Sequence, residues 1–84
     1  MNVTVEHNLS ERRFDVVRDG KSMGYLTYSV SGRILDIRHT VVDLEYRGQG
    51  LGRILVDSTI DFAKKEGLTV IPSCSYADRV MNNK

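Results

Sequence analysis

The stretch of residues 42–52, VDLEYRGQGLG, joins a β-like run to an amphipathic helix and so decides the architecture of the chain. Its glycines stand at positions 48, 50 and 52, and a residue without a Cβ atom lets backbone N–H groups approach an anion closely. The following helix adds unpaired N–H groups and the positive end of its dipole, and Arg47 adds a fixed positive charge. This pattern predicts a binding site for a phosphate or pyrophosphate. The alternative is a tight strand-to-helix connection whose glycines serve backbone geometry alone.

Two better-known phosphate loops do not match this stretch. The dinucleotide motif G-x-G-x-x-G requires two residues between its second and third glycines, whereas Leu51 alone separates Gly50 from Gly52. The Walker motif ends in Gly-Lys-Ser/Thr, whereas Arg53 follows Gly52. The motif that remains is Arg-x-x-Gly-x-Gly, which begins at Arg47.

Short β-like segments precede the glycine loop. Alternating apolar residues and the enrichment in tyrosine and threonine predict strands at residues 3–6, 14–18, 23–30 and 34–42. Asp19-Gly20 is a strong signal for a two-residue hairpin, and Ser31-Gly32 indicates a further turn. Because these connections are short, we expect an antiparallel meander of four strands.

The period of the pattern changes after the loop. Residues 51–66 are predicted to form a helix whose apolar half contains Leu51, Leu55, Val56, Ile60, Phe62 and Ala63, with charged residues on the other half. Gly67 follows two lysines and predicts the helix end. Residues 68–71 are predicted to form a fifth strand, which ends at Pro72. Residues 76–82 are predicted to form a short terminal helix. A strand, a helix and a strand in succession imply a parallel crossover, so the fold class is α+β.

The arginine-glycine motif resembles the acyl-CoA pyrophosphate loop of the GNAT N-acetyltransferase superfamily. Residues 39–42 (HTVV), the loop, and residues 70–76 (VIPSCSY) together resemble its small stand-alone branch, the N-acetyltransferase-domain-containing type. The resemblance implies a minimal GNAT-like fold and a single acyl-CoA-binding domain over residues 1–84. It also implies acetyl-CoA as the cosubstrate and an amine acceptor of unidentified structure.

The resemblance further implies which residues bind coenzyme A. The amides of residues 49–53 would hold the pyrophosphate, Arg47 would orient the loop or meet the 3′-phosphate, and the pantetheine arm would pair along the edge of the strand at residues 36–42. The expected CoA-binding residues are Val41, Val42, Arg47, Gly48, Gln49, Gly50, Leu51, Gly52 and Arg53.

Cys74 is the only cysteine and lies just past a predicted strand, where the resemblance places the acyl-transfer centre. A free thiol has a pKa of about 8.5, so a nucleophilic role requires activation by a neighbour. Two interpretations stay open. Cys74 either forms an acetyl-thioester or is a small apolar residue that lines the acyl pocket.

Three further residues are catalytic candidates. His39 is expected on the strand face shared with Leu35 and Ile37, either as a half-buried core histidine or as a base. Thr40, on the opposite face, would place its hydroxyl or N–H near the thioester carbonyl. By analogy with many GNAT enzymes, Tyr76 would protonate the departing CoA thiolate.

Composition bounds the remaining possibilities. The chain has 84 residues, which suits one domain, and 12 basic against 11 acidic residues give a net charge of +1 that lends no support to a nucleic-acid partner. The single cysteine and the absence of a Cys/His cluster predict neither an internal disulfide nor a metal site. No signal-peptide pattern or membrane-length apolar run is present, so we expect a cytoplasmic monomer or weak homodimer.

Three hypotheses of function follow. The first is an acetyl-CoA-dependent N-acetyltransferase that acts by direct amine attack or through an acetyl-cysteine. The second is a non-catalytic acyl-CoA-binding or sensing module. The third, a structural domain, would leave the glycine loop and the Pro72-Ser73-Cys74 segment unexplained.

Overall fold

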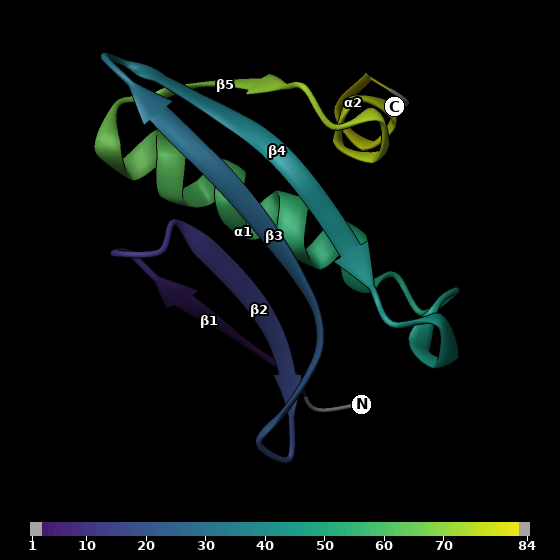
Figure 1. Ribbon diagram of the computed structural model, residues 1–84. Coiled ribbons are helices and arrows are strands. Elements are labelled where there is room, and N and C mark those ends of the chain that lie inside the picture. Colours follow the sequence, from purple (N-terminus) through teal and green to yellow (C-terminus); the bar gives the residue numbers. More distant parts are fainter. Residues whose placement is uncertain (1–2, 83–84) are drawn as a thin grey trace.

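The computed structural model describes residues 3–82, in which five strands, a short 3-10 helix and two α-helices follow one another. Their bounds are β1 Thr4–Asn8, β2 Arg13–Arg18, β3 Lys21–Ser31, β4 Ile34–Val42, η1 Leu44–Tyr46, α1 Leu51–Glu66, β5 Thr69–Pro72 and α2 Ser75–Asn82. The strands form one mixed sheet in the order β1-β2-β3-β4-β5 (Figure 1). The predicted α+β class is confirmed. β4 and α1 have the predicted bounds, the other strands and α2 differ by one or two residues at one or both ends, and η1 was not predicted.

The meander of β1 to β4 is antiparallel throughout, as predicted. Arg18 pairs with Lys21 across the expected two-residue turn between β2 and β3. Both turn residues have positive φ, 53° for Asp19 and 76° for Gly20, which the twist of a two-residue hairpin favours. The Asp19-Gly20 pair therefore sets the register of this hairpin.

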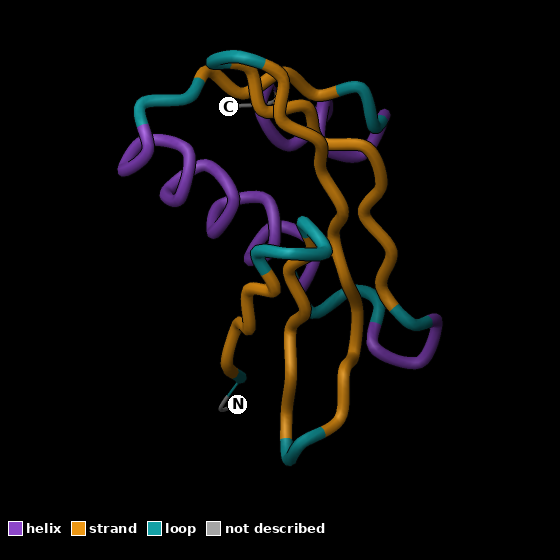
Figure 2. Tube along the Cα trace, turned by 60° about the vertical axis from the view of Figure 1, so that its left-hand side comes forward, coloured by secondary structure: helices purple, strands orange, loops and turns teal. Residues whose placement is uncertain are grey.

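Helix α1 covers one face of the sheet (Figures 1 and 2). The buried core between them consists of Phe14, Val16, Met23, Leu26, Tyr28, Leu35, Ile37, Leu51, Leu55, Val56 and Ala63, together with Ala77 of α2. Thr59 of α1 is also buried, and it fits there because its hydroxyl donates to the Leu55 carbonyl at 2.9 Å. No helix in the described part of the chain is long and apolar enough to span a membrane.

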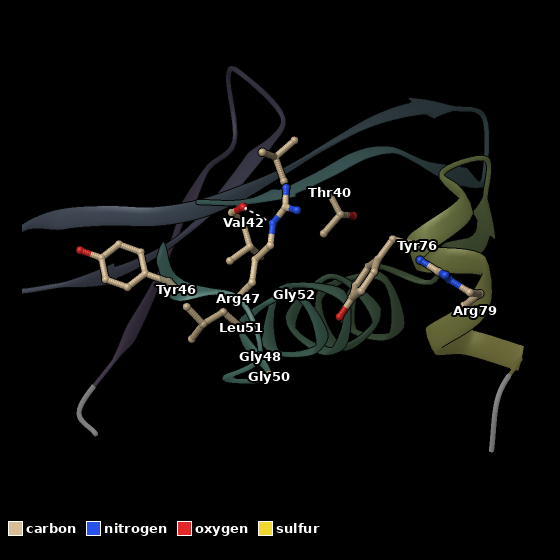
Figure 3. Close-up of a pocket in the computed structure, with 11 residues that line it drawn as sticks. Thr40, Val42, Tyr46, Arg47, Gly48, Gly50, Leu51, Gly52, Tyr76 and Arg79 are labelled. Atoms are coloured by element: carbon tan, nitrogen blue, oxygen red, sulfur yellow. Dashed lines mark hydrogen bonds between the residues drawn. The ribbon is translucent and has the colours of Figure 1, made fainter. Parts of the chain in front are cut away.

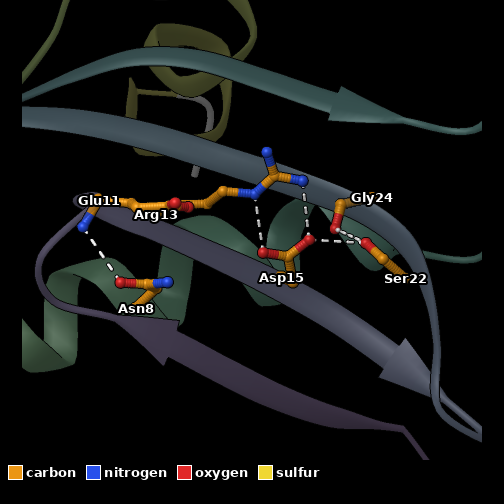
Figure 4. Close-up of polar contacts among 6 residues, drawn as sticks. All are labelled: Asn8, Glu11, Arg13, Asp15, Ser22 and Gly24. Atoms are coloured by element: carbon orange, nitrogen blue, oxygen red, sulfur yellow. Dashed lines mark hydrogen bonds and ion pairs between the residues drawn. The ribbon is translucent and has the colours of Figure 1, made fainter.

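The face of β2 and β3 turned away from α1 is polar (Figure 4). Arg13 Nε donates to Asp15 Oδ1 at 2.8 Å, and the Ser22 hydroxyl donates to Asp15 Oδ2 at 2.7 Å. The hydrogen bond from Arg13 lowers the pKa of Asp15, and burial opposes it. The Arg13 guanidinium also lies 4.2 Å from the centre of the Tyr25 ring. The outer face therefore carries polar contacts, whereas the apolar core lies between the sheet and α1.

Strand β5 pairs with β4 over only part of β4. The parallel pairing runs from Ile34 opposite Thr69 to Ile37 opposite Pro72, which confirms the predicted crossover. β4 continues to Val42, whereas the chain leaves β5 and enters α2. Beyond Ile37 the described strands therefore form a fork, and one edge of β4 has no partner strand there.

Candidate active site

A pocket of about 480 Å³ lies between the end of β4, the glycine loop, the first turn of α1 and one side of α2 (Figure 3). Its lining residues are Thr40, Val41, Val42, Tyr46, Arg47, Gly48, Gly50, Leu51, Gly52, Tyr76 and Arg79. Segments 39 residues apart in the chain thus meet at one site. Most of the residues predicted to bind CoA line this pocket.

Two glycines of the loop are required by backbone conformation. Gly48 and Gly50 have φ values of 84° and 76°, in the left-handed region, and a Cβ atom at either position would meet no neighbour within 4 Å. A side chain there would have room but would strain the backbone. The geometry that glycine permits therefore shapes the loop.

Helix α1 begins with free amides. Its N-cap is Gly50, which offers no side-chain acceptor, and no acidic residue lies in its first turn. The first intrahelical bond runs from the Ile54 N–H to the Gly50 carbonyl at 3.2 Å. The N–H groups of residues 51–53 precede it and have no acceptor within the helix. With the positive end of the helix dipole, they form a place suited to an anion.

Gly52 lines the pocket as predicted and also makes a contact that was not predicted. It has an ordinary helical backbone within α1, so no positive φ calls for glycine there. A Cβ atom there would instead lie 2.6 Å from the Tyr76 hydroxyl oxygen. Its missing side chain makes room for the Tyr76 ring.

Two arginines bring positive charge to opposite sides of the pocket (Figure 3). Arg47 Nε donates to the Val42 carbonyl at 3.3 Å, which ties the loop to the end of β4 and agrees with the predicted orienting role. Arg79 of α2 was not predicted. It lies three residues after Tyr76 and hence on the same side of a helix, a spacing that could have identified it. Tyr46 of η1 also lines this pocket.

A β-bulge in β4 decides which of its side chains reach the pocket. Thr27 of β3 pairs with His39, and the next residue, Tyr28, pairs with Ile37. Strand β4 therefore carries one extra residue, Arg38, at this point. An extra residue interrupts the alternation of side chains between the two faces of a sheet.

Because of this bulge, the predicted faces of His39 and Thr40 are wrong. Leu35 and Ile37 are buried as expected, but His39 is exposed and does not line the pocket. Thr40 instead lines the pocket, and its Oγ1 is buried. The role of His39 as a base stays a prediction that its position does not favour.

Cys74 lies where β5 gives way to α2. Its N–H donates to the Ile37 carbonyl at 3.0 Å, and its own carbonyl accepts the Asp78 N–H at 2.9 Å, so it stands at the N-cap of α2. Burial raises the pKa of the half-buried Cys74 thiol, but the polar groups around the thiol, which are the Ala77 amide, the Thr40 hydroxyl and the backbone of Tyr76 and Thr40, lower it by more. The net effect lowers the pKa of Cys74, which favours the thiolate.

Among the groups that lower the pKa of Cys74, the Thr40 hydroxyl is the one that belongs to a side chain. Its Oγ1 is buried and has no hydrogen-bond partner of standard geometry among the described residues. The sulfur of Cys74 is an acceptor within its reach, and the contact contributes to the lowered pKa of that thiol. A buried hydroxyl without a full partner is costly, and an ionised sulfur would satisfy it better than a neutral thiol.

Not all predicted residues line the pocket directly. Gln49 and Arg53 belong to the loop and the first turn of α1 but are not among the lining residues, and Cys74 borders the pocket through its neighbours Thr40 and Tyr76. In residues 3–82 no group of three or more His, Cys, Asp or Glu side chains is placed to hold a metal ion. The site is therefore built from amides, two guanidinium groups, hydroxyls and one thiol.

The sequence model described as GCN5-related N-acetyl-transferase matches residues 13–84. The chain belongs to this family. The GNAT chain is 34% identical over 79 residues to Protein NATD1 of Mus musculus, and the match covers 92% of this chain and 72% of that protein. These matches confirm the predicted family and its small branch.

Solved structures agree with this assignment. A GCN5-like protein from Staphylococcus aureus superposes on the GNAT chain with a TM-score of 0.75 at 27% identity, covering 98% of this chain and 80% of that one. The ribosomal-protein-S18-alanine N-acetyltransferase from Escherichia coli gives a TM-score of 0.74 at 26% identity over 87% of this chain, which spans only 52% of that enzyme. A GNAT family N-acetyltransferase from Escherichia coli in complex with CoA is 31% identical, with a TM-score of 0.64 over 71% of this chain and 38% of that one.

Proposed function

We propose that this chain is an acetyl-CoA-dependent N-acetyltransferase that passes the acetyl group to an amine through a thioester on Cys74. One observation carries the proposal: two helix N-termini open beside the unpaired end of β4, one with free amides and the other with a thiol whose pKa is lowered. Free amides suit the phosphates of CoA, and a thiolate suits attack on a thioester. Membership in the GNAT family and a fold shared with a CoA complex support acetyl-CoA as the donor.

The proposed CoA path begins at α1. The N–H groups of residues 51–53 donate hydrogen bonds to the pyrophosphate oxygens, while Arg47 and Arg79 supply positive charge from two sides. The pantetheine arm then runs along the unpaired edge of β4, where backbone groups near Val41 can pair with its amides as a neighbouring strand would. This path leads the thioester toward Thr40 and the start of α2.

Cys74 is the proposed nucleophile. Its thiolate forms a bond to the thioester carbonyl carbon, the bond between that carbon and the CoA sulfur breaks, and the CoA thiolate leaves and takes a proton from solvent. The amine then attacks the acetyl-cysteine, loses its proton to solvent, and the Cys74 thiolate departs. The amides of Tyr76 and Ala77 and the Thr40 hydroxyl stabilise that thiolate at the beginning and the end of the cycle.

One observation favours the thiol route over direct attack by the amine. Direct attack is assisted by a general base beside the thioester. The pocket-lining residues within the described part of the chain include no His, Asp or Glu, and His39 points elsewhere. A non-catalytic acyl-CoA-binding module would use the same loop and pocket but would give Cys74 no chemical task.

Intact mass spectrometry after incubation with acetyl-CoA tests the proposal. We expect the mass of one acetyl group to be added under denaturing conditions, because a thioester survives unfolding. The addition should disappear with hydroxylamine and should be absent from a Cys74→Ala variant. Since Cys74 is the only cysteine, the parent and this variant form a matched pair.

The second half of the experiment separates the alternatives. The acetylated protein, freed of acetyl-CoA, should lose its acetyl group faster when amines are added. Bound CoA under native conditions with no covalent acetyl group, combined with turnover in Cys74→Ala, would indicate direct attack. Bound CoA with neither acetylation nor turnover would indicate the binding module.

A further inference from the structure

Gly52 lines the pocket, but the conformation of its backbone does not require glycine. Glycine is a poorer helix former than alanine, and Gly52 lies inside α1 with an ordinary helical backbone. The loop has already obtained its conformation from Gly48 and Gly50, whose φ values are positive. The neighbours of Gly52 show which contact an added Cβ atom would disturb.

That contact is the end of the Tyr76 ring. A Cβ atom on Gly52 would lie 2.6 Å from Tyr76 Oη, 2.7 Å from Cζ and 2.8 Å from Cε2. Figure 3 shows the ring standing between α2 and the first turn of α1, with its hydroxyl directed at that turn. The phenol thus rests on the backbone of α1 at the place where a side chain would otherwise stand.

The other end of Tyr76 belongs to the thiol site. Its backbone N–H is one of the donors that lower the pKa of Cys74, and the next residue, Ala77, supplies another. Helix α2 spans only eight residues, of which Ala77 alone is buried. So short a helix depends on tertiary contacts for its position, and the Tyr76 ring supplies one of them.

We propose that Tyr76 is a positioning residue, which holds Cys74 against Thr40 of β4 by resting its ring on Gly52 of α1. The contact joins the two halves of the site, the free amides of α1 and the thiol at the start of α2. The proton-donor role that the resemblance implies for Tyr76 stays a prediction, and the contact with Gly52 is a separate task of the same side chain. The positioning contact does not depend on the proposed function. Only its use in catalysis rests on that function, which makes Cys74 the nucleophile.

The test is the pH dependence of Cys74 alkylation by iodoacetamide in the free protein. Cys74 is the only cysteine, so the rate reports on this thiol alone, and the thiolate is the reacting form. Gly52→Ala and Tyr76→Ala should each move the rate profile to higher pH and slow alkylation at neutral pH several-fold. The double variant should be no slower than Tyr76→Ala, because the added methyl group then meets no ring.

Two controls keep the test specific. Tyr76→Phe retains the ring and should retain the profile, and Lys65→Ala removes an exposed side chain in the last turn of α1 and should also leave it unchanged. Circular dichroism verifies folding, and Tyr76→Leu replaces Tyr76→Ala if the latter does not fold. Unchanged profiles in both single variants, or effects that multiply in the double variant, would overturn the proposal. Because no CoA or amine is used, these outcomes are independent of whether the chain transfers acetyl groups.

Discussion

Helix α1 starts at Gly50, which has no side chain to cap the first amides, whereas α2 starts at Cys74, and the amides of that helix help to lower the pKa of its thiol. A glycine N-cap costs only about a few tenths of a kcal/mol relative to a capping side chain, so the uncapped start of α1 is cheap. The start of α1 lies beside Arg47 and an open pocket, and the start of α2 lies against the buried Thr40 hydroxyl. The N–H groups at a helix N-terminus thus face an external anion at α1 and the thiolate of the protein's own Cys74 at α2.

The N-termini of α1 and α2 should therefore respond to different perturbations. The start of α1 should be sensitive to changes that hinder the approach of a ligand. The start of α2 should be sensitive to changes in the donors that surround the sulfur, with or without a ligand.

The largest effect is expected for Gly50→Val. A β-branched residue at a φ of 76° strains the backbone by about 1–3 kcal/mol and distorts the loop that exposes the amides. CoA binding, measured by isothermal titration calorimetry, should be lost. Gly20→Val is a matched control, since Gly20 has the same φ of 76° and equally open surroundings in the β2–β3 turn. It should lose similar stability and keep CoA affinity; equal affinity losses in both variants would refute the anion-binding site.

A single amide of α1 can be removed by Arg53→Pro. Proline is tolerated in the first turn of a helix because the N–H there has no intrahelical partner. We expect CoA to bind about 1.5–3 kcal/mol more weakly than to the parent if this N–H donates to a phosphate. Arg53→Ala removes the charged side chain and keeps the amide, so it corrects for the charge. Similar affinities of the proline and alanine variants would show that the Arg53 amide is not used.

The smallest effect is expected for Thr40→Val, which removes a donor to Cys74 and keeps the shape of the side chain. The pKa of Cys74 should rise toward its ordinary value, so alkylation at neutral pH should slow. The folded pKa of the parent thiol is lowered, so the fold gains stability as pH rises through that pKa, and the variant should lose part of this gain. Parallel denaturation curves at neutral and alkaline pH, or an unchanged alkylation profile, would count against the Thr40 contact.

Much of the fold could be predicted from local sequence because local rules govern it. The apolar period of residues 51–66, the lysines before Gly67 and the Asp19-Gly20 turn indicate their structures without reference to distant residues. The α+β order and the parallel crossover follow from the succession of these elements. The Arg47-x-x-Gly-x-Gly motif located the pocket for the same reason, since a strand, a loop and a helix start are adjacent in the chain.

Local sequence indicates the strands, the α-helices, the family and the loop, whereas tertiary packing determines which side chains face the site. One extra residue, Arg38, exchanged the expected faces of His39 and Thr40, because a bulge depends on pairing with β3 and leaves no local signal. The contact of Gly52 with Tyr76 and the entry of Arg79 into the pocket depend on where α2 packs. These residues are far apart in sequence, so their relation arises only when the sheet and both helices share one core.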